Sequence, residues 1–406
     1  MTRSRMLRRL APLAGLAALV VGCASEPPGY EGPYRKEVRA AIPRLEESSG
    51  LAFQRLPVLE TRTRDEVRAF LEREFNAQLT PLQLAGTQGA YRLFGLLPDS
   101  LDLRTFLLDL LTEQVAGYYD PKTKVLYVVD DAAPEIRDVT ITHELMHALQ
   151  DQHTRLDSVE TLRGQNDRMV AMQAVIEGQA VLEQLSVMTG GDLEGRIPGG
   201  WGGVRELIRE GQEAMPEFAA APMFLQETLL FPYLSGAEFV RRVKRQRPGK
   251  PPYAPFAAST EQVLHPEKYL DSLPDLPTTV TLPVPRGGSV VHEDDLGEFE
   301  TRLLLFQHLG DEATAVRGAA GWDGDRYQLL AIDGGQALVW ASVWDSADEA
   351  AEFRTLLARA RPPVAGRVRR ITSATVDGRA VVCYEDAAAG VSRPLLACDG
   401  VRLTPR

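Results

Sequence analysis

The chain has few of the residues and motifs from which most reactive centres are built. Of its 406 residues only three are cysteine and six are histidine. It contains neither the GxSxG motif of a serine-nucleophile elbow nor the GxxxxGK[ST] motif of a phosphate-binding loop. The apolar run at residues 10–21 is too short to span a membrane stably, and no other stretch is apolar for long enough. The sequence therefore argues against serine-hydrolase chemistry, P-loop chemistry and a transmembrane anchor.

The first apolar run has the surroundings of a secretion signal. Four arginines precede it, and it ends in the tetrapeptide Val-Val-Gly-Cys23. This pattern is typical of a bacterial lipoprotein signal peptide, residues 1–22, after which Cys23 receives lipid. Residues 23–35 follow as a flexible tether. We expect lipid anchoring in the bacterial cell envelope, on the extracytoplasmic side of the membrane. A generic signal peptide with an incidental cysteine is the alternative.

Acidic residues outnumber basic ones. Residues 1–22 hold four arginines and no acid, so the remaining chain has 41 basic and 56 acidic residues, a balance of −15. This charge argues against nucleic acid or an anionic membrane surface as a partner. Cys383 and Cys398 are the other cysteines, and in an oxidising compartment they can form a disulfide across neighbouring strands of one sheet. Two buried free thiols are the alternative.

Candidate metal ligands are concentrated in the segment His143-Glu-Leu-Met-His147. Two histidines four residues apart lie one turn apart on the same face of an α-helix, so both imidazoles can reach one metal ion. Glu144, beside the first histidine, can act as a general base. Pro134 suits the first turn of this helix, and apolar stripes on two sides predict that it is buried. The HExxH spacing predicts one zinc ion per chain.

A hydrolytic zinc site usually has three protein ligands, and two residues compete for the third place. His153 has the spacing of the long metzincin motif HExxHxxGxxH, but Gln150 stands where that motif has glycine. If the helix continues, His153 lies about 9 Å along the axis and about 120° around it from His147, which is out of reach. Glu177 is the better candidate, because a carboxylate in an apolar helical segment needs a compensating charge. Glu183 is a weaker alternative.

The pattern His143-Glu-x-x-His147, followed downstream by Glu177-Gly-x-Ala, resembles the gluzincin metallopeptidases, the thermolysin-like group. The resemblance covers the middle third of the chain. It implies a mainly helical zincin-type domain with zinc bound by His143, His147 and Glu177. It also implies that Glu144 serves as general base and acid. Thermolysin-like enzymes have an aspartate four residues after the ligand glutamate to orient a histidine. Here Val181 occupies that position, so the orienting residue must lie elsewhere.

Two flanking segments fit the same interpretation. Residues 117–129 predict a strand, a turn and a second strand just before the motif helix. In gluzincins an edge strand in this place pairs with the extended substrate, whereas a plain core hairpin is the alternative. Residues 229–240 resemble the helix that follows the third ligand in several peptidase lineages. Tyr233 could there donate its hydroxyl to the oxyanion, and a tyrosine packed beside the core is the alternative.

The whole chain predicts an α+β protein in two parts. Residues 36–285 form the mainly helical domain with a small β-hairpin, and within it the glycine-rich residues 190–202 are a candidate lid. Residues 286–406 form a smaller α+β accessory domain with an antiparallel sheet. In its Trp-Asp-Gly-Asp run, residues 322–325, the acids could bind a cation, but the composition favours a turn. Helices of the first part, apart from the motif helices, are expected near residues 38–45, 64–77 and 101–111.

These features predict a zinc-dependent peptidase, an endopeptidase acting on a peptide or protein substrate. It would cleave peptide bonds through a metal-activated water, with Glu144 as general base. The alternative is a non-catalytic envelope lipoprotein with a structural or vestigial zinc site and a partner-binding C-terminal domain. Glu144 separates the two hypotheses, because a structural zinc site needs no general base beside it.

Overall fold

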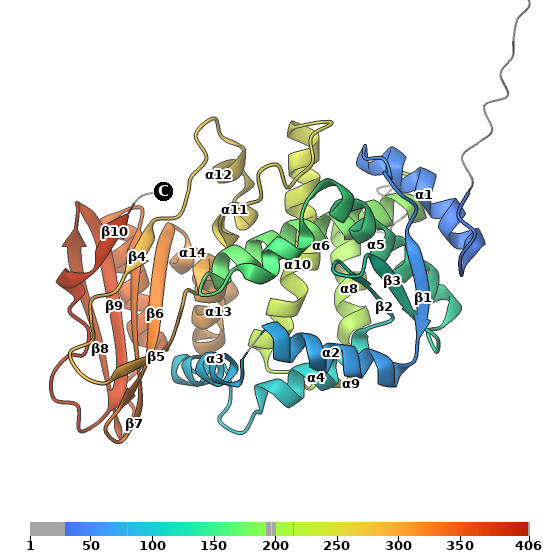
Figure 1. The fold of residues 1–406 in the computed structure, drawn as a ribbon. Coiled ribbons are helices and arrows are strands. Elements are labelled where there is room, and N and C mark those ends of the chain that lie inside the picture. The colour runs from blue at the N-terminus through green and yellow to red at the C-terminus, as the bar shows by residue number, and fades with distance from the viewer. Residues whose placement is uncertain (1–28, 79, 192–195, 197–199, 214, 405–406) are drawn as a thin grey trace, which may run out of the picture.

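The computed structural model of the chain describes residues 29–78, 80–191, 196, 200–213 and 215–404. The predicted signal peptide, Cys23 and most of the candidate lid lie outside these residues. The class is α+β, as predicted, with a helical body on one side and a five-stranded sheet on the other (Figure 1). Among the described residues, no helix is both long and apolar enough to cross a membrane.

The helical body begins with four helices and one strand. They are α1 (Arg35–Ser49), β1 (Val58–Arg62), α2 (Arg64–Gln78), α3 (Pro81–Phe94) and α4 (Leu103–Gln114). The sequence predicted α1, α2 and α4 but not β1 or α3. Yet α3 begins with a strong signal: Thr80 and Gln83 form a capping box, and Pro81 occupies the first turn.

A small mixed sheet lies next to the motif helix. As predicted, β2 (Gly117–Asp120) and β3 (Val125–Val129) form an antiparallel hairpin, and β1 pairs with β3 in parallel. The strand order β1-β3-β2 leaves β2 at one edge. Buried apolar side chains join this sheet to α1 and to the motif helix α5 (Pro134–His153). The hairpin and the HExxH helix are therefore parts of one packed unit.

Two long helices cross in the middle of the body (Figure 1). They are α6 (Asn166–Thr189) and α10 (Met223–Gln246). Around them lie shorter helical elements: η1 (Leu156–Thr161), α8 (Gly200–Glu213), α9 (Pro216–Ala219), α11 (Thr260–Leu264) and α12 (Pro266–Leu270).

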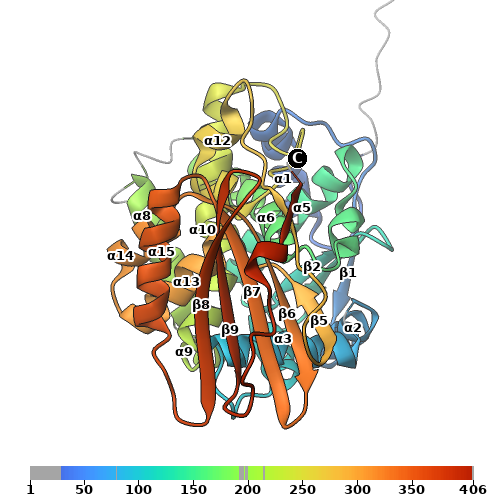
Figure 2. The same cartoon turned by 90° about the vertical axis from the view of Figure 1, so that its left-hand side faces the viewer.

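The C-terminal part is built on an antiparallel sheet with the order β5-β6-β7-β9-β8, and Figure 2 shows these strands side by side. The strands are β5 (Ser289–Asp294), β6 (Trp322–Ile332), β7 (Gly335–Trp344), β8 (Arg367–Val376) and β9 (Arg379–Ala388). The helices are α13 (Gly297–Leu309), α14 (Glu312–Ala319) and α15 (Ala347–Ala360). One buried cluster runs from the helical body into this part, since it contains both Ala174 of α6 and Trp340 of β7.

The acids of the Trp-Asp-Gly-Asp run lie in strand β6, so the predicted turn is wrong. Asp325 is buried and accepts hydrogen bonds from the backbone N–H groups of Leu296 and Gly297, at the start of α13. It also accepts from the indole N–H groups of Trp322 and Trp340. Four donors satisfy the buried carboxylate, which caps the helix N-terminus from a neighbouring strand.

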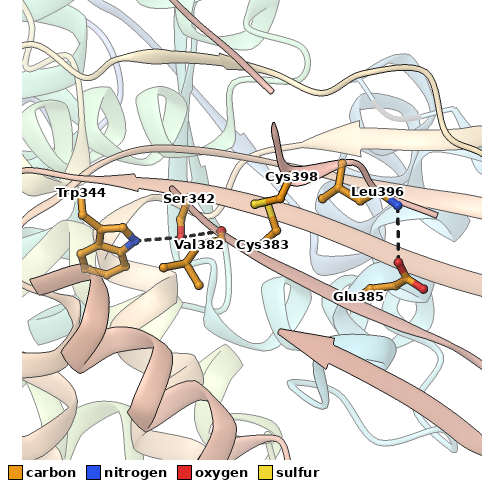
Figure 3. The surroundings of a disulfide bond; sticks show 7 residues. All are labelled: Ser342, Trp344, Val382, Cys383, Glu385, Leu396 and Cys398. Carbon is orange, nitrogen blue, oxygen red and sulfur yellow. Dashed lines mark hydrogen bonds between the residues drawn. A yellow bond between two sulfur atoms is a disulfide. The ribbon is translucent and has the colours of Figure 1, made fainter. Parts of the chain in front are cut away.

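The other face of the sheet is covered by the C-terminal segment together with β4 (Thr279–Thr281), which pairs with β10 (Arg402–Thr404). A disulfide joins Cys383 of β9 to Cys398 (Figure 3). Contrary to the prediction of two neighbouring strands, Cys398 begins the 3₁₀ turn η2 (Cys398–Gly400). The preceding Leu395 and Leu396 donate their N–H groups to the carboxylate of Glu385 instead of to a strand, which keeps this segment out of the sheet.

We predict that removing this disulfide destabilises the C-terminal part. The bond closes a loop with a sequence separation of 15 residues, for which the lost chain entropy corresponds to about 3 kcal/mol. The double variant Cys383→Ala/Cys398→Ala should show this loss in chemical denaturation. Reduction of the wild-type protein should give a similar shift, and the variant should not respond to reductant. An unchanged denaturation midpoint would contradict the role assigned to the bond.

Candidate metal centre

Three of the predicted ligand atoms meet between α5 and α6. The Nε2 atom of His143 is 3.1 Å from Glu177 Oε2 and 3.2 Å from His147 Nε2. His147 Nε2 is 3.4 Å from the same Glu177 oxygen. Tetrahedral ligand atoms at 2.0–2.1 Å from a zinc ion lie about 3.3 Å apart. The three atoms thus form a triangle of the size that one zinc ion requires, and a carboxylate oxygen of Glu144 lies within 4.8 Å of a ring nitrogen of each histidine.

The two competing ligand candidates point elsewhere. Helix α5 continues without a break through Gln150 to its last residue, His153. The Nε2 atom of His153 lies 2.8 Å from the carbonyl oxygen of Ala52, away from the triangle. Glu183 is fully buried and forms an ion pair with Lys244 of α10. The structure therefore brings Glu177, and neither His153 nor Glu183, to the histidine pair.

The position of Glu177 depends on how closely α6 and α10 approach. A Cβ atom added to Gly178 would lie 2.1 Å from the carbonyl carbon of Gly236, and one added to Gly236 would lie 2.0 Å from the carbonyl oxygen of Ala174. The two backbones are thus in direct contact, which only glycine permits. Glu177 precedes Gly178, and Tyr233 lies one turn before Gly236. The crossing consequently places both side chains beside the motif helix.

A glutamine amide holds the second ring nitrogen of each histidine. His143 Nδ1 is 2.9 Å from Gln184 Oε1, and His147 Nδ1 is 2.9 Å from Gln150 Oε1. Gln184 and Gln150 thus orient the two histidines, the role for which Val181 is unsuited, and only indirect signals in the sequence pointed to them. Gln150 was noted as a departure from the metzincin glycine. Gln184 lies seven residues, or two helical turns, after Glu177 on the same face of α6.

The edge strand β2 contacts Glu144 directly. The Val129 N–H donates to the carbonyl of Ala116. Hydrogen-bonded and non-hydrogen-bonded residue pairs alternate along an antiparallel ladder, so this bond shows which residues of β2 direct their backbone groups toward β3. The backbone groups of Gly117 and Tyr119 therefore face away from β3. The Tyr119 N–H donates to Glu144 Oε2 at 2.8 Å. One oxygen of Glu144 is held by the strand, and the strand edge beside Glu144 is the one that a peptide could extend.

Asp151 fastens the hairpin to the motif helix. Asp151 lies on α5, four residues after His147, and the sequence analysis assigned it no role. The Tyr119 hydroxyl and the Lys124 ammonium group both donate to Asp151 Oδ2, each at 2.7 Å. Because Asp151 lies two turns after Glu144 on α5, these contacts fix the strand relative to the cluster.

The charges in the cluster favour a cation. Burial raises the pKa of Glu144. For His147, burial lowers the pKa, but the charge and hydrogen bond of Glu177 outweigh it and raise the pKa to about 9. Although burial opposes the effect, the two histidines hold the pKa of Glu177 far below its usual range. The site thus stabilises a positive charge at the point where the three ligand atoms meet, and a divalent ion would satisfy the same carboxylate.

Tyr233 lies next to the first histidine. The centroids of the Tyr233 and His143 rings are 6.3 Å apart, with the ring planes tilted by 35°. The charge of Glu177, burial and the charge of Glu144 raise the pKa of Tyr233 well above its usual value. Its hydroxyl therefore keeps its proton and is available as a hydrogen-bond donor near the cluster.

A comparison with protein families matches the C-terminal part of the chain. Residues 284–388 match a family described as a domain of unknown function (DUF8575), and this range includes all five strands of the C-terminal sheet but not the metal centre. No curated protein matches the chain. A solved structure, of a candidate hydrolase with a novel fold from Chloroflexus aurantiacus, is 16% identical and covers 58% of this chain and 87% of its own, with a TM-score of 0.34. A score this low does not equate the two folds.

We predict that Gly178→Ala destabilises the protein by about 1–3 kcal/mol, because the new methyl group meets the backbone of α10. This cost exceeds the gain of about 1 kcal/mol that alanine brings to a helix. Gly211→Ala is the matched control, since Gly211 lies in α8 with nothing near its added Cβ. The control should be neutral or stabilised in chemical denaturation. Equal effects of the two substitutions would show that the helices do not depend on this contact.

Proposed function

We propose that this chain is a zinc-dependent peptidase that binds one zinc ion per chain through His143, His147 and Glu177. The observation that carries the proposal is the triangle of ligand atoms, with sides of 3.1, 3.2 and 3.4 Å. A carboxylate suited to proton transfer, Glu144, lies beside it. Two histidines, one ligand carboxylate and an adjacent general base form the donor set of a hydrolytic rather than a purely structural zinc site.

Glu144 has the surroundings that a general base needs. When bound, zinc would supply Lewis acidity toward a peptide carbonyl and lower the pKa of a water molecule. Glu144 Oε2 is held by the Tyr119 N–H, so Oε1 is the oxygen that can take a proton from that water. Burial raises the pKa of Glu144 and thereby increases its basicity. The same carboxyl group can then return the proton to the leaving amine.

The edge strand supports a peptide as the substrate. The outward-facing backbone groups of β2, at Gly117 and the carbonyl of Tyr119, lie along the side of the cluster where Glu144 is held. An extended peptide could add to this edge by main-chain hydrogen bonds, which would bring one of its carbonyls to the metal. Asp151 keeps the strand in place through Tyr119 and Lys124. The edge of β2 can pair with the middle of an extended peptide, so cleavage would occur at internal peptide bonds. We therefore propose an endopeptidase.

The metal content of variants tests the ligand set. The purified mature chain, residues 24–406, should contain about one zinc ion by elemental analysis. Glu177→Ala should lose the metal, because it removes one of three ligands, whereas His153→Ala should keep it. Loss of zinc in His153→Ala but not in Glu177→Ala would contradict the proposed centre. A wild-type protein that binds no zinc would sink the enzyme proposal.

Glu144→Gln tests the catalytic role separately. It should keep the zinc ion and lower peptide hydrolysis by at least about a hundredfold, since general acid–base catalysis contributes at least that much. The measurement is cleavage of an unstructured protein such as casein, followed by peptide release. Metal binding without hydrolysis in the wild-type protein would favour the non-catalytic lipoprotein instead.

Tyr233→Phe should lower kcat by about a hundredfold or more while KM and zinc content stay nearly unchanged, because an oxyanion donor acts mainly in the transition state. Tyr253→Phe is the matched control. Tyr253 is buried outside the cluster, and its hydroxyl has no partner among the described residues. A loss of kcat that is equal in both variants, or absent from Tyr233→Phe, would leave Tyr233 as a packing residue.

A further inference from the structure

Neutral amides hold both histidines of the proposed metal centre. Gln150 Oε1 and Gln184 Oε1 each lie 2.9 Å from the Nδ1 atom of their histidine. A histidine that binds metal through Nε2 usually donates its Nδ1–H to a carboxylate, a carbonyl or water, and this partner tunes the basicity of the ring. The charge of the partner is therefore a functional property of the site.

The surroundings of Gln150 determine which way its amide points. Its Nε2 atom lies 3.0 Å from the carbonyl oxygen of Ile176 and 3.0 Å from Gln179 Oε1. A backbone carbonyl can only accept a hydrogen bond, so the NH₂ group of Gln150 must face Ile176. The amide oxygen then faces His147, whose Nδ1 must carry the proton. In the neutral ring, the form that binds a metal ion, the lone pair of His147 is then on Nε2 and is directed to the centre.

Gln150 also connects the two ligand-bearing helices. It lies one turn after His147 on α5, and its amide donates to the residue that precedes Glu177 on α6. Gln150 is fully buried, so its three contacts are protected from competition with water. His143 makes the second connection directly, from α5 to Gln184 on α6.

We propose that Gln150 and Gln184 are positioning residues that hold both histidines as Nδ1–H tautomers without adding charge to the metal centre. The proposal rests on the zinc site of the proposed function. Because Gln150 and Gln184 are neutral, Glu177 is the one anion among the three ligands and the two residues that hold the histidines. A bound divalent ion would then keep a net positive charge. Such a centre binds its metal less tightly than one held by carboxylates, but it withdraws more electron density from a bound carbonyl.

Gln184 offers the sharper test because it is only partly buried, so a glutamate can replace it with less desolvation. Gln184→Glu should strengthen metal binding about tenfold by raising the basicity of His143, and Gln184→Ala should weaken it about tenfold. A residue that merely filled space would not give effects of opposite sign. Gln173→Glu is the charge-matched control, since it places the same charge on the exposed side of α6.

The experiment is a titration of metal-free protein with Co²⁺ at one fixed pH, followed by the visible absorption of the ion. Gln184→Glu should change the position of the cobalt bands as well as the affinity, and Gln173→Glu should change neither. Gln150→Leu should lower the affinity about tenfold or more, with folding checked by denaturation. If Gln150→Leu fails to fold, the Gln184 variants still decide the question.

The outcomes separate this inference from the proposed function. Equal affinities and spectra for wild type, Gln184→Glu and Gln184→Ala would overturn the positioning role while leaving the metal site intact. A wild-type protein that binds no Co²⁺ would overturn both proposals. The expected affinity changes without any peptide hydrolysis would support the amide-held centre and count against the peptidase.

Discussion

The contact between the backbones of α6 and α10 is the constraint on which the rest of the site depends. Gly178 and Gly236 leave no room for a side chain on either helix. Because Glu177 and Tyr233 are one and three residues from these glycines, their positions follow from the crossing. The same helices carry the ion pair between the buried Glu183 and the partly exposed Lys244, and α10 also packs on α13 of the C-terminal part. The crossing thus connects the metal centre to the main core.

The parts of the site that could be predicted were those encoded locally. The HExxH spacing depends only on helical periodicity, so the relation of His143, Glu144 and His147 follows once the helix forms. Glu177 was recognisable because a carboxylate in an apolar helix needs a compensating charge. His153 could be set aside with the same periodicity. Each of these inferences used the geometry of a single helix, for which sequence is sufficient.

The features that sequence did not predict depend on contacts between elements. Gln184 meets His143 only when α5 and α6 pack at one particular offset, and nothing in either helix alone specifies that offset. Cys398 was expected in a strand next to that of Cys383, but Glu385 accepts the N–H groups of Leu395 and Leu396 that a strand would use. Helix α3 is a different case, since the capping box at Thr80 was readable in the sequence and was overlooked.

The arrangement makes the metal centre sensitive to small displacements of α6. This helix supplies both Glu177, a proposed ligand, and Gln184, which holds the opposite side of His143. A shift of α6 by one residue would rotate each of them by about 100° away from α5. Both contacts would then be lost together, while the two histidines and Glu144 kept their relation to one another. Moving the third ligand to another position along α6 would therefore require a change in the packing of α6 against α10. This requirement couples the geometry of the centre to the stability of the fold.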